Sequence, residues 1–384
     1  NRIKARIIPM KQTIVKHASQ LILLCIVIVG ILLRFVMLGE IPTALNRDEA
    51  ALGYTAWSLM YTSRDEHGVL LPVNIQSFGD WKLPVYVYGL IPFISVFGLH
   101  EWSVRLLSAL SGVFYILMSY LICKNLSAEG EKKHAHFFNI TLLPLVVALF
   151  VAISPWSVHL SRIAYEANLA MALFSGGLLS FLLFIRSSEV TTKKRAKSFN
   201  AYASAILFSL TLFTYHSYQV FTPLFASALI IVFRKDLLKI WKLSKNTIIG
   251  PVTVFISLFI LLIVSQNSGA NSTKFSGITI FSEKQYEQTL FENRELTSTA
   301  PTIASKLYIS MPKLILDRVA TNIMNIVSPQ FLFIQGGSHG SHNFPGVGNM
   351  FWFSFLTLPL GIFIAVSLRT RFHTMLLLWV LMAM

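Results

Sequence analysis

Long apolar runs, several of them about as long as a membrane is thick, are the feature that most constrains how this chain folds. Of its 384 residues, 54% are hydrophobic and 13% are charged, against about 25% charged residues in an ordinary soluble domain. An α-helix needs a run of about 20 apolar residues to cross a bilayer. The composition therefore excludes a soluble globular protein and predicts a polytopic, all-α membrane protein.

The basic residues fall in short clusters between the apolar runs. The chain has 32 lysines and arginines against 17 acids, a net charge of +15, which would suit a nucleic-acid binder if the charge covered one folded surface. Its distribution in short clusters is instead typical of the cytoplasmic loops of membrane proteins. We therefore expect no nucleic-acid partner.

About nine membrane-spanning helices are predicted from this pattern. If the N-terminus is cytoplasmic, five basic clusters that hold 20 of the 32 lysines and arginines all fall on the cytoplasmic side, as the positive-inside rule requires. Residues 83–99 are apolar but contain two prolines, and we expect them to lie at the interface or to re-enter the membrane. The predicted spans are residues 18–38, 104–123, 137–154, 167–185, 201–216, 219–233, 247–265 and 351–368, with a ninth starting at 374.

Two long segments, residues 39–103 and 266–350, are expected on the outer face. The first carries seven acids against three bases, so we expect acidic chemistry on that face. We interpret residues 1–384 as a single transmembrane domain, with 39–103 forming an outer catalytic loop with interfacial helices. Because the chain starts at Asn1 and its last apolar run is about half a span, we interpret it as a fragment of a longer protein.

A pair of adjacent carboxylates, Asp48 and Glu49, closely follows the first predicted span, and Tyr54 lies further along the same segment. Adjacent residues project in different directions from a helix, so one carboxylate can face a site while a neighbour such as Arg47 holds the other. A solvated helix start rich in acids gives the same pattern. The residues alone leave both interpretations open.

Three cations on the predicted outer face form a second candidate group. Lys82 precedes the interfacial segment, Arg105 opens the second span, and Arg162 follows the third. Arginines on the outer face run against the positive-inside trend and require an anionic partner, although each could also be a simple membrane anchor. Carboxylates and cations at one interface suit a lipid phosphate substrate, because cations hold the phosphate while a carboxylate removes a proton from an acceptor.

Three further residues are weaker candidates for substrate contact: Tyr54 in the segment after the adjacent carboxylates, and Tyr215 and His216 at a predicted outer turn. His339 and His342 stand in a glycine-rich segment that has no acid and no fixed helical spacing. Zinc-type sites need a fuller set of ligands. We therefore predict no metal site, and a requirement for a divalent cation is not indicated.

Five short motifs occur in a particular order along the chain. They are Arg47-Asp48-Glu49-Ala50 with Tyr54, Lys82-Leu83-Pro84-Val85-Tyr86, Ser103-Val104-Arg105-Leu106-Leu107-Ser108-Ala109-Leu110, Ser154-Pro155 with Ser161-Arg162, and Pro329-Gln330-Phe331-Leu332-Phe333 with Gly336-Gly337. In this order they resemble the protein O-mannosyltransferase and aminoarabinose-transferase superfamily, GT-C membrane glycosyltransferases that use polyprenyl-phosphate sugars. The resemblance covers roughly residues 20–350. The acidic residue that follows the first pair in this family is not clearly matched.

The resemblance implies a GT-C fold and an enzyme that transfers a hexose or pentose, with inversion at the anomeric carbon, from a polyprenyl-phosphate sugar to a lipid, glycan or protein. Asp48 would be the base, and Glu49 would position it or hold a substrate hydroxyl. Lys82, Arg105 and Arg162 would bind the donor phosphate. The implied location is the outer face of a bacterial plasma membrane, with membrane lipid and the donor as partners.

A lipid-linked saccharide flippase or other transporter is the alternative class. Transporters place ionisable groups near the bilayer midplane, whereas the predicted spans are nearly free of charge. A non-catalytic scaffold would not need an acidic loop facing outer arginines. The glycosyltransferase is therefore the favoured hypothesis, without identification of the sugar or the acceptor.

Overall fold

A computed structural model of the protein describes residues 2–134, 141–186, 194–266, 310–337, 343, 346–368 and 370–383. The described chain is mostly helical, as predicted. Its helices are α1 (Arg2–Phe35), α2 (Arg47–Thr62), α3 (Pro84–Phe97), α4 (Glu101–His134), α5 (Leu142–Ile153), α6 (Pro155–Arg162), α7 (Glu166–Arg186), α8 (Lys194–Leu212), α9 (Tyr218–Val232), α10 (Arg234–Leu243), α11 (Asn246–Gln266), α15 (Met311–Val327), the π-helix η1 (Gln330–Ile334), α16 (Ser354–Leu368) and α17 (Arg371–Ala383). Strands β1 (Ile75–Ser77) and β2 (Asp80–Lys82) form an antiparallel hairpin.

Four helices in the described part of the chain are long and apolar enough to cross a membrane. These are His17–Phe35 in α1, Glu101–Ser127 in α4, Glu166–Arg186 in α7 and Asn246–Ser265 in α11. Helices α5 and α6 meet at an angle of 52° and provide a fifth if the bent pair counts as one broken span.

The described residues therefore show four or five of the nine predicted spans. The other four predicted spans fall on α8, α9, α16 and α17. Of these, the apolar helices α9, α16 and α17 are only 10–17 residues long over their apolar part. Helix α8 begins with a basic stretch, which shortens its apolar part. Residues 267–309, most of the predicted second outer segment, lie outside the described residues.

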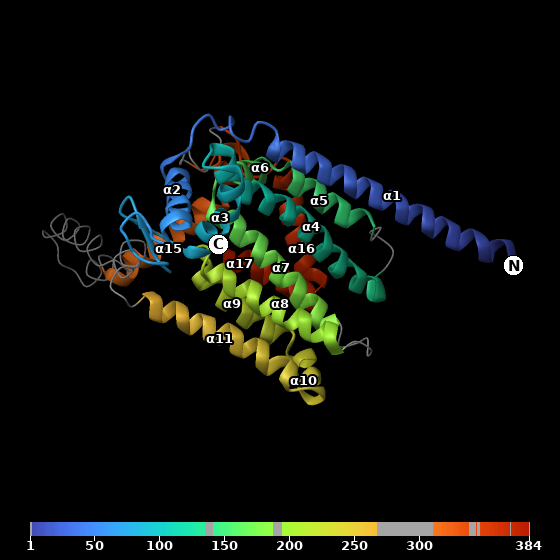
Figure 1. Ribbon diagram of the computed structural model, residues 1–384. Helices are drawn as coiled ribbons and strands as arrows, with labels where there is room; N and C mark the ends of the chain where they lie inside the picture. The colour runs from blue at the N-terminus through green and yellow to red at the C-terminus, as the bar shows by residue number, and fades with distance from the viewer. Residues whose placement is uncertain are drawn as a thin grey trace, which may run out of the picture.

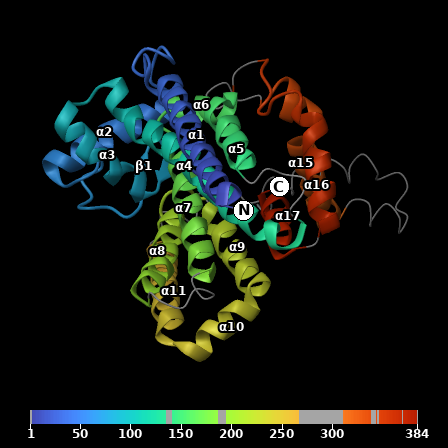
Figure 2. The same ribbon diagram turned by 90° about the vertical axis from the view of Figure 1, so that its right-hand side faces the viewer.

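The long helices run roughly side by side, and α2, α3 and the hairpin gather at one end of them (Figure 1). Helix α7 packs on both α4 and α8, and α8 also packs on α11. Figure 2 shows α15 and α16 on one side of the molecule, where α16 packs on α17. Phe174 of α7 is fully buried, and its ring contacts those of Phe208, Phe225 and Trp379. This aromatic cluster joins α7, α8, α9 and α17.

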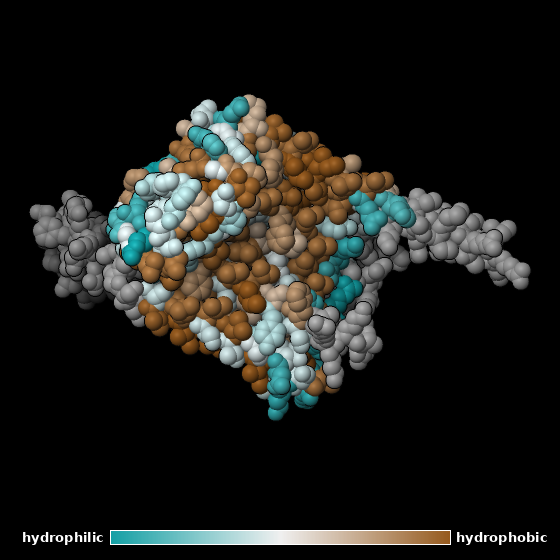
Figure 3. Space-filling model, in the orientation of Figure 1, coloured by the Kyte–Doolittle hydropathy of each residue, from teal (hydrophilic) through white to brown (hydrophobic). Residues whose placement is uncertain are grey.

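A hydrophobic surface covers the middle of the molecule in Figure 3, with hydrophilic residues toward its two ends. Leu21 and Leu24 of α1 and Ile260 and Val264 of α11 are each more than half exposed. Soluble monomers rarely expose an apolar surface of this extent, whereas helices in lipid expose it routinely because their backbone groups are bonded internally. The surface is the one expected of an integral membrane protein.

Candidate functional site

Helix α2 begins with a capping box that fixes the adjacent carboxylates. Asn46 Oδ1 accepts a hydrogen bond from the Glu49 amide at 2.9 Å, and Glu49 Oε2 accepts one from the Asn46 amide at 3.0 Å. This reciprocal pairing satisfies two amides that would otherwise lack partners at a helix start. Asp48, in the same first turn, is also favoured by the positive end of the helix dipole.

Glu49 is buried and fully engaged. Its side chain is 1% exposed and accepts the Arg105 Nε–H at 2.9 Å and the Ala164 amide at 2.8 Å, in addition to the Asn46 amide. Glu49 thereby ties α2 to α4 and to the connection between α6 and α7. Of the two roles expected for Glu49, this geometry fits positioning and leaves no free oxygen for a substrate hydroxyl.

Arg105 is fully buried, and its guanidinium bonds to the chain that leads into α2. Besides Glu49, it donates to the carbonyls of Leu38, Pro42 and Ala44 at 2.8–3.0 Å. The expectation that Arg105 binds phosphate directly does not fit this geometry, because its donors point at protein acceptors. The anionic partner that the sequence predicted for Arg105 is Glu49.

Arg162 closes the end of the first long helix. It donates to the carbonyls of Leu33, Val36, Met37 and Ile41 at 2.8–3.2 Å. Leu33 lies in the last turn of α1, where carbonyls have no partner within the helix. The other three residues follow the helix, so the guanidinium also binds the chain that leaves α1. Direct phosphate binding by Arg162 does not fit this arrangement either.

Lys82 and Asp80 are presented by the hairpin. Ser77 pairs with Asp80, so the turn consists of Phe78 and Gly79, both with positive φ, as the tight two-residue hairpin turn requires. Residues two apart in a strand lie on the same face. The turn therefore places Asp80 and Lys82 on one face of β2.

Three carboxylates surround the Lys82 ammonium. Its Nζ lies 3.0 Å from Asp48 Oδ1, 3.3 Å from Asp80 Oδ2 and 3.9 Å from Glu166 Oε1. Burial acts to lower the pKa of Lys82, but the charges of Glu166, Asp48 and Asp80 outweigh it, so the pKa is raised above its usual value. Lys82 is therefore an ammonium at neutral pH, and the four residues form what we call the Lys82 cluster.

Exposure differs within the Lys82 cluster. The Asp48 and Asp80 side chains are 37% and 32% exposed, whereas those of Lys82 and Glu166 are 9% and 10% exposed. Asp48 is thus the carboxylate that is both fixed in the first turn of a helix and accessible to solvent. Among the described residues, no group of His, Cys, Asp and Glu is arranged to hold a metal ion, and the lysine occupies the centre between the acids.

The turn between α8 and α9 borders the Lys82 cluster. Tyr215 and Tyr165 share a hydrogen bond of 3.2 Å between their hydroxyls, and His216 Nε2 lies 3.1 Å from the Trp81 carbonyl. Burial, the contact with Tyr215 and the charges of Glu166 and Asp48 raise the pKa of Tyr165. The structure therefore brings Tyr215 and His216 to the site. Tyr54 instead stacks on Trp57, with ring centroids 6.0 Å apart, and is 48% exposed.

Asp80, Tyr165 and Glu166 also belong to the site, and none of them was predicted from the sequence. Asp80 lies two residues before Lys82, a spacing that places both on one face of a strand. Glu166 is the single acid between Glu131 and Glu189, and it stands at the start of an apolar run. A lone acid at the end of a span was the signal that could have identified it.

The fold resembles that of GT-C membrane glycosyltransferases. Among solved structures, the archaeal oligosaccharyltransferase AglB from Archaeoglobus fulgidus, in complex with an inhibitory peptide and a dolichol-phosphate, has a TM-score of 0.51 at 14% identity over 95% of this chain and 47% of that chain. ArnT from Cupriavidus metallidurans in the apo state has a TM-score of 0.49 at 15% identity over 80% of this chain and 54% of that chain. The chain spans about half the length of these proteins. No known family profile and no curated protein matches the sequence.

Proposed function

We propose that the chain is a glycosyltransferase that moves a sugar from a polyprenyl-phosphate donor to an acceptor at the outer face of the membrane. The observation that carries this proposal is the Lys82 cluster, in which a partly exposed carboxylate and an ammonium meet at one end of a GT-C-like membrane fold. The dolichol-phosphate in the AglB complex supports the donor class.

Asp48 is the proposed base. It takes the proton of the acceptor hydroxyl as the acceptor oxygen bonds to the anomeric carbon. The bond between that carbon and the phosphate oxygen breaks, and its electron pair leaves with the lipid phosphate. Attack from the face opposite the phosphate inverts the anomeric carbon. Asp48 suits this role because it is 37% exposed and fixed at a helix start. A positioned base contributes about 10²–10⁴-fold to such a reaction.

Lys82 is the proposed phosphate ligand, because a fixed cation stabilises the charge that develops on the leaving group. Asp80 and Glu166 hold its ammonium at 3.3 and 3.9 Å, so they act as positioning residues. Glu166 is also the candidate for the acidic residue that the family resemblance left unmatched. Tyr215 and His216 border this site and are the proposed contacts for substrate hydroxyls.

Arg105 and Arg162 act through the backbone in this proposal. Both bind carbonyls of the chain between α1 and α2, which sets where α2 starts and therefore where Asp48 lies. The two arginines therefore have a positioning role in place of the direct phosphate contacts expected from the sequence. Glu49, which is bonded to Arg105, has the same positioning role.

The Asp48→Asn variant tests the base. It keeps the size of the side chain and a hydrogen-bond acceptor for Lys82, so we expect normal folding and donor binding with turnover lowered at least ~10²-fold. The measurement is sugar transfer from defined polyprenyl-phosphate sugars in nanodiscs, with donor affinity measured on the same sample.

Glu40→Gln is the matched control, because Glu40 is an exposed acid of the same outer segment, and its turnover should stay near that of the wild type. Wild-type turnover in Asp48→Asn would remove Asp48 as the base. Loss of donor binding together with turnover would make it a ligand. Movement of the donor across the membrane of sealed vesicles, without sugar transfer, would favour a flippase.

A further inference from the structure

Helix α10 is a short amphipathic helix between α9 and α11 that is anchored by one face. Ile240 is fully buried in the core around Phe174, and so is Phe233, which directly precedes the helix. Asp236 is buried and accepts a hydrogen bond from Arg371 of α17. The Arg371 guanidinium also lies 5.5 Å from the Phe233 ring centroid. These contacts fix the orientation of α10 and leave its other face exposed.

The presented face carries a concentration of positive charge. Lys235, Lys239 and Lys242 follow one another at spacings of four and three residues, so they line one side of the helix. All three are exposed, as are Arg234 and Lys245 at the two ends. Asp236 is the one acid of this helix, and Arg371 already neutralises it. The surface of α10 therefore has an uncompensated positive charge.

Exposed apolar side chains flank these cations. Leu238, Trp241 and Leu243 are 59%, 39% and 75% exposed. Lys245 Nζ lies 6.0 Å from the Trp241 ring centroid. A helix whose exposed lysines are flanked by exposed Trp and Leu is typical of the membrane interface, where the apolar groups enter the acyl boundary and the lysines reach the headgroups.

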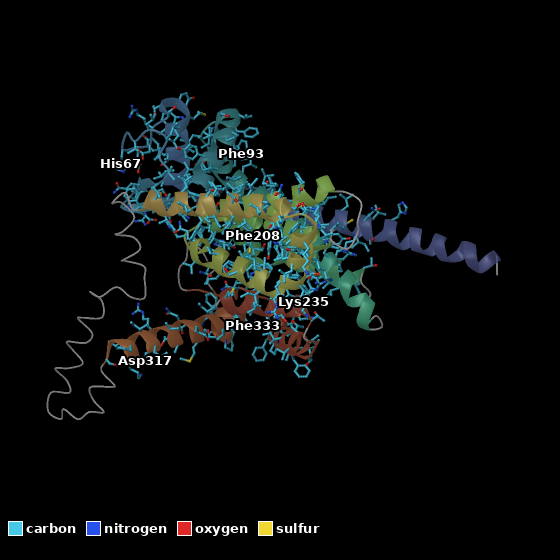
Figure 4. All side chains as sticks on the ribbon, turned by 90° about the horizontal axis from the view of Figure 1, so that it is seen from below. His67, Phe93, Phe208, Lys235, Asp317 and Phe333 are labelled. Carbon is cyan, nitrogen blue, oxygen red and sulfur yellow. The ribbon has the colours of Figure 1, made fainter. Side chains whose placement is uncertain are left out.

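The position of α10 agrees with this environment. The membrane-spanning part of α11 begins at Asn246, directly after α10 and a two-residue connection. Lys235 lies at the opposite end of the helical bundle from His67 of the first outer segment (Figure 4). In Figure 3 hydrophilic residues at the lower edge adjoin the hydrophobic belt in the region of α10. Helix α10 therefore lies beside the start of a candidate membrane span, at the opposite end of the bundle from His67.

We propose that α10 is a docking surface for anionic phospholipid headgroups in the leaflet opposite the candidate active site. Charge complementarity favours an anionic partner, and the exposed Trp241 and Leu238 beside the start of a span favour a lipid over an acidic protein segment. Each lysine or arginine near an anionic membrane surface adds about 1 kcal/mol of attraction, so several act together. The lipid would hold α10 and, through the Asp236–Arg371 pair, α17.

The test is native mass spectrometry of the full chain in detergent micelles containing equal amounts of phosphatidylglycerol and phosphatidylcholine with the same acyl chains. We expect the wild type to retain phosphatidylglycerol about tenfold over phosphatidylcholine, and Lys235→Gln/Lys239→Gln/Lys242→Gln to lose most of that preference. Added salt should weaken the preference, because it screens exposed charges. The substituted residues are exposed, and circular dichroism checks that the helix content is unchanged.

Two control variants identify the origin of the preference. Replacing the same three lysines by arginine keeps the charge and should keep the preference. Arg318→Gln removes an exposed cation of α15 and should also leave it unchanged. The proposal is overturned if the wild type shows no preference, if the glutamine variant keeps it in full, or if Arg318→Gln loses as much as the three substitutions in α10.

Discussion

Asp48 and Glu49 are neighbours in the chain with opposite environments. The Asp48 side chain is 37% exposed and faces Lys82, whereas Glu49 is 1% exposed and bonded to Arg105. Adjacent helical residues point in different directions, so the sequence could predict that one of the two carboxylates would be held by a neighbour. The neighbour expected from the sequence was Arg47, whereas Glu49 is held by Arg105. The sequence could not identify Arg105, because 56 residues separate the partners.

The buried Glu49–Arg105 pair should control stability rather than donor binding. Removing one member of a buried pair leaves an uncompensated charge and costs about 3–5 kcal/mol. We expect Glu49→Leu and Arg105→Met each to destabilise the chain strongly, and the double variant to lose less than the sum of the two. The measurement is a double-mutant cycle on thermal unfolding in detergent.

Donor affinity, measured on the folded fraction of each variant, distinguishes the two roles considered for Arg105. An Arg105→Met variant with wild-type stability and weakened donor binding would contradict the positioning role and restore the direct phosphate contact. Purely additive losses in the cycle would show that the two side chains act independently, contrary to the contact at 2.9 Å.

The length of the apolar runs was enough to predict the long apolar helices. It was not enough to predict the short elements that are stabilised by contacts within the protein. The predicted spans at 18–38, 104–123, 167–185 and 247–265 correspond to four apolar helices of the structure. Helix α10 was not predicted, because a ten-residue segment rich in lysine resembles a basic loop in the sequence. The β1–β2 hairpin was also missed, since each strand has only three residues and its turn places a phenylalanine at positive φ.

Close packing of α4 against α1 and α6 depends on Gly112. A Cβ at this position would lie 2.1 Å from Ser161 Oγ and 2.7 Å from Arg34 Nε. Arg34 is fully buried there and donates to the carbonyls of Val151 and Ala152. A methyl group would therefore disturb a buried polar contact, and overpacking of this kind costs about 1–3 kcal/mol. We expect Gly112→Ala to lower the apparent melting temperature by several degrees.

Gly361 offers the matched control for this prediction. It lies in α16, and a Cβ there would meet no atom within 4 Å. Because alanine is the better helix former by about 1 kcal/mol, Gly361→Ala should leave the melting temperature unchanged or raise it slightly. Equal shifts for the two variants at one scan rate would show that the space around Gly112 does not limit the packing of α4.

At the scale of the whole molecule, the carboxylates of the candidate site and the lysines of α10 lie at opposite ends. The Lys82 cluster, with three carboxylates, lies among α2, the hairpin and the start of α7, whereas the cations of α10 lie at the other end of the bundle. The sequence could predict this division because charge of one sign is concentrated in separate segments. The contact between Lys82 and Glu166 could not be predicted, because it depends on where the hairpin places Lys82 relative to the start of α7.

The separation of acidic and basic segments also predicts how the protein is oriented in the membrane. The basic clusters should face the cytoplasm, which places His67 of the first outer segment outside and Lys193, which lies outside the described residues, inside. In a chain whose two cysteines, Cys25 and Cys123, are replaced by alanine, a membrane-impermeant thiol reagent should label His67→Cys in intact cells. Lys193→Cys should react only after the membrane is permeabilised. Labelling of Lys193→Cys from outside would reverse the orientation and place the Lys82 cluster on the cytoplasmic side, which would exclude sugar transfer at the outer face.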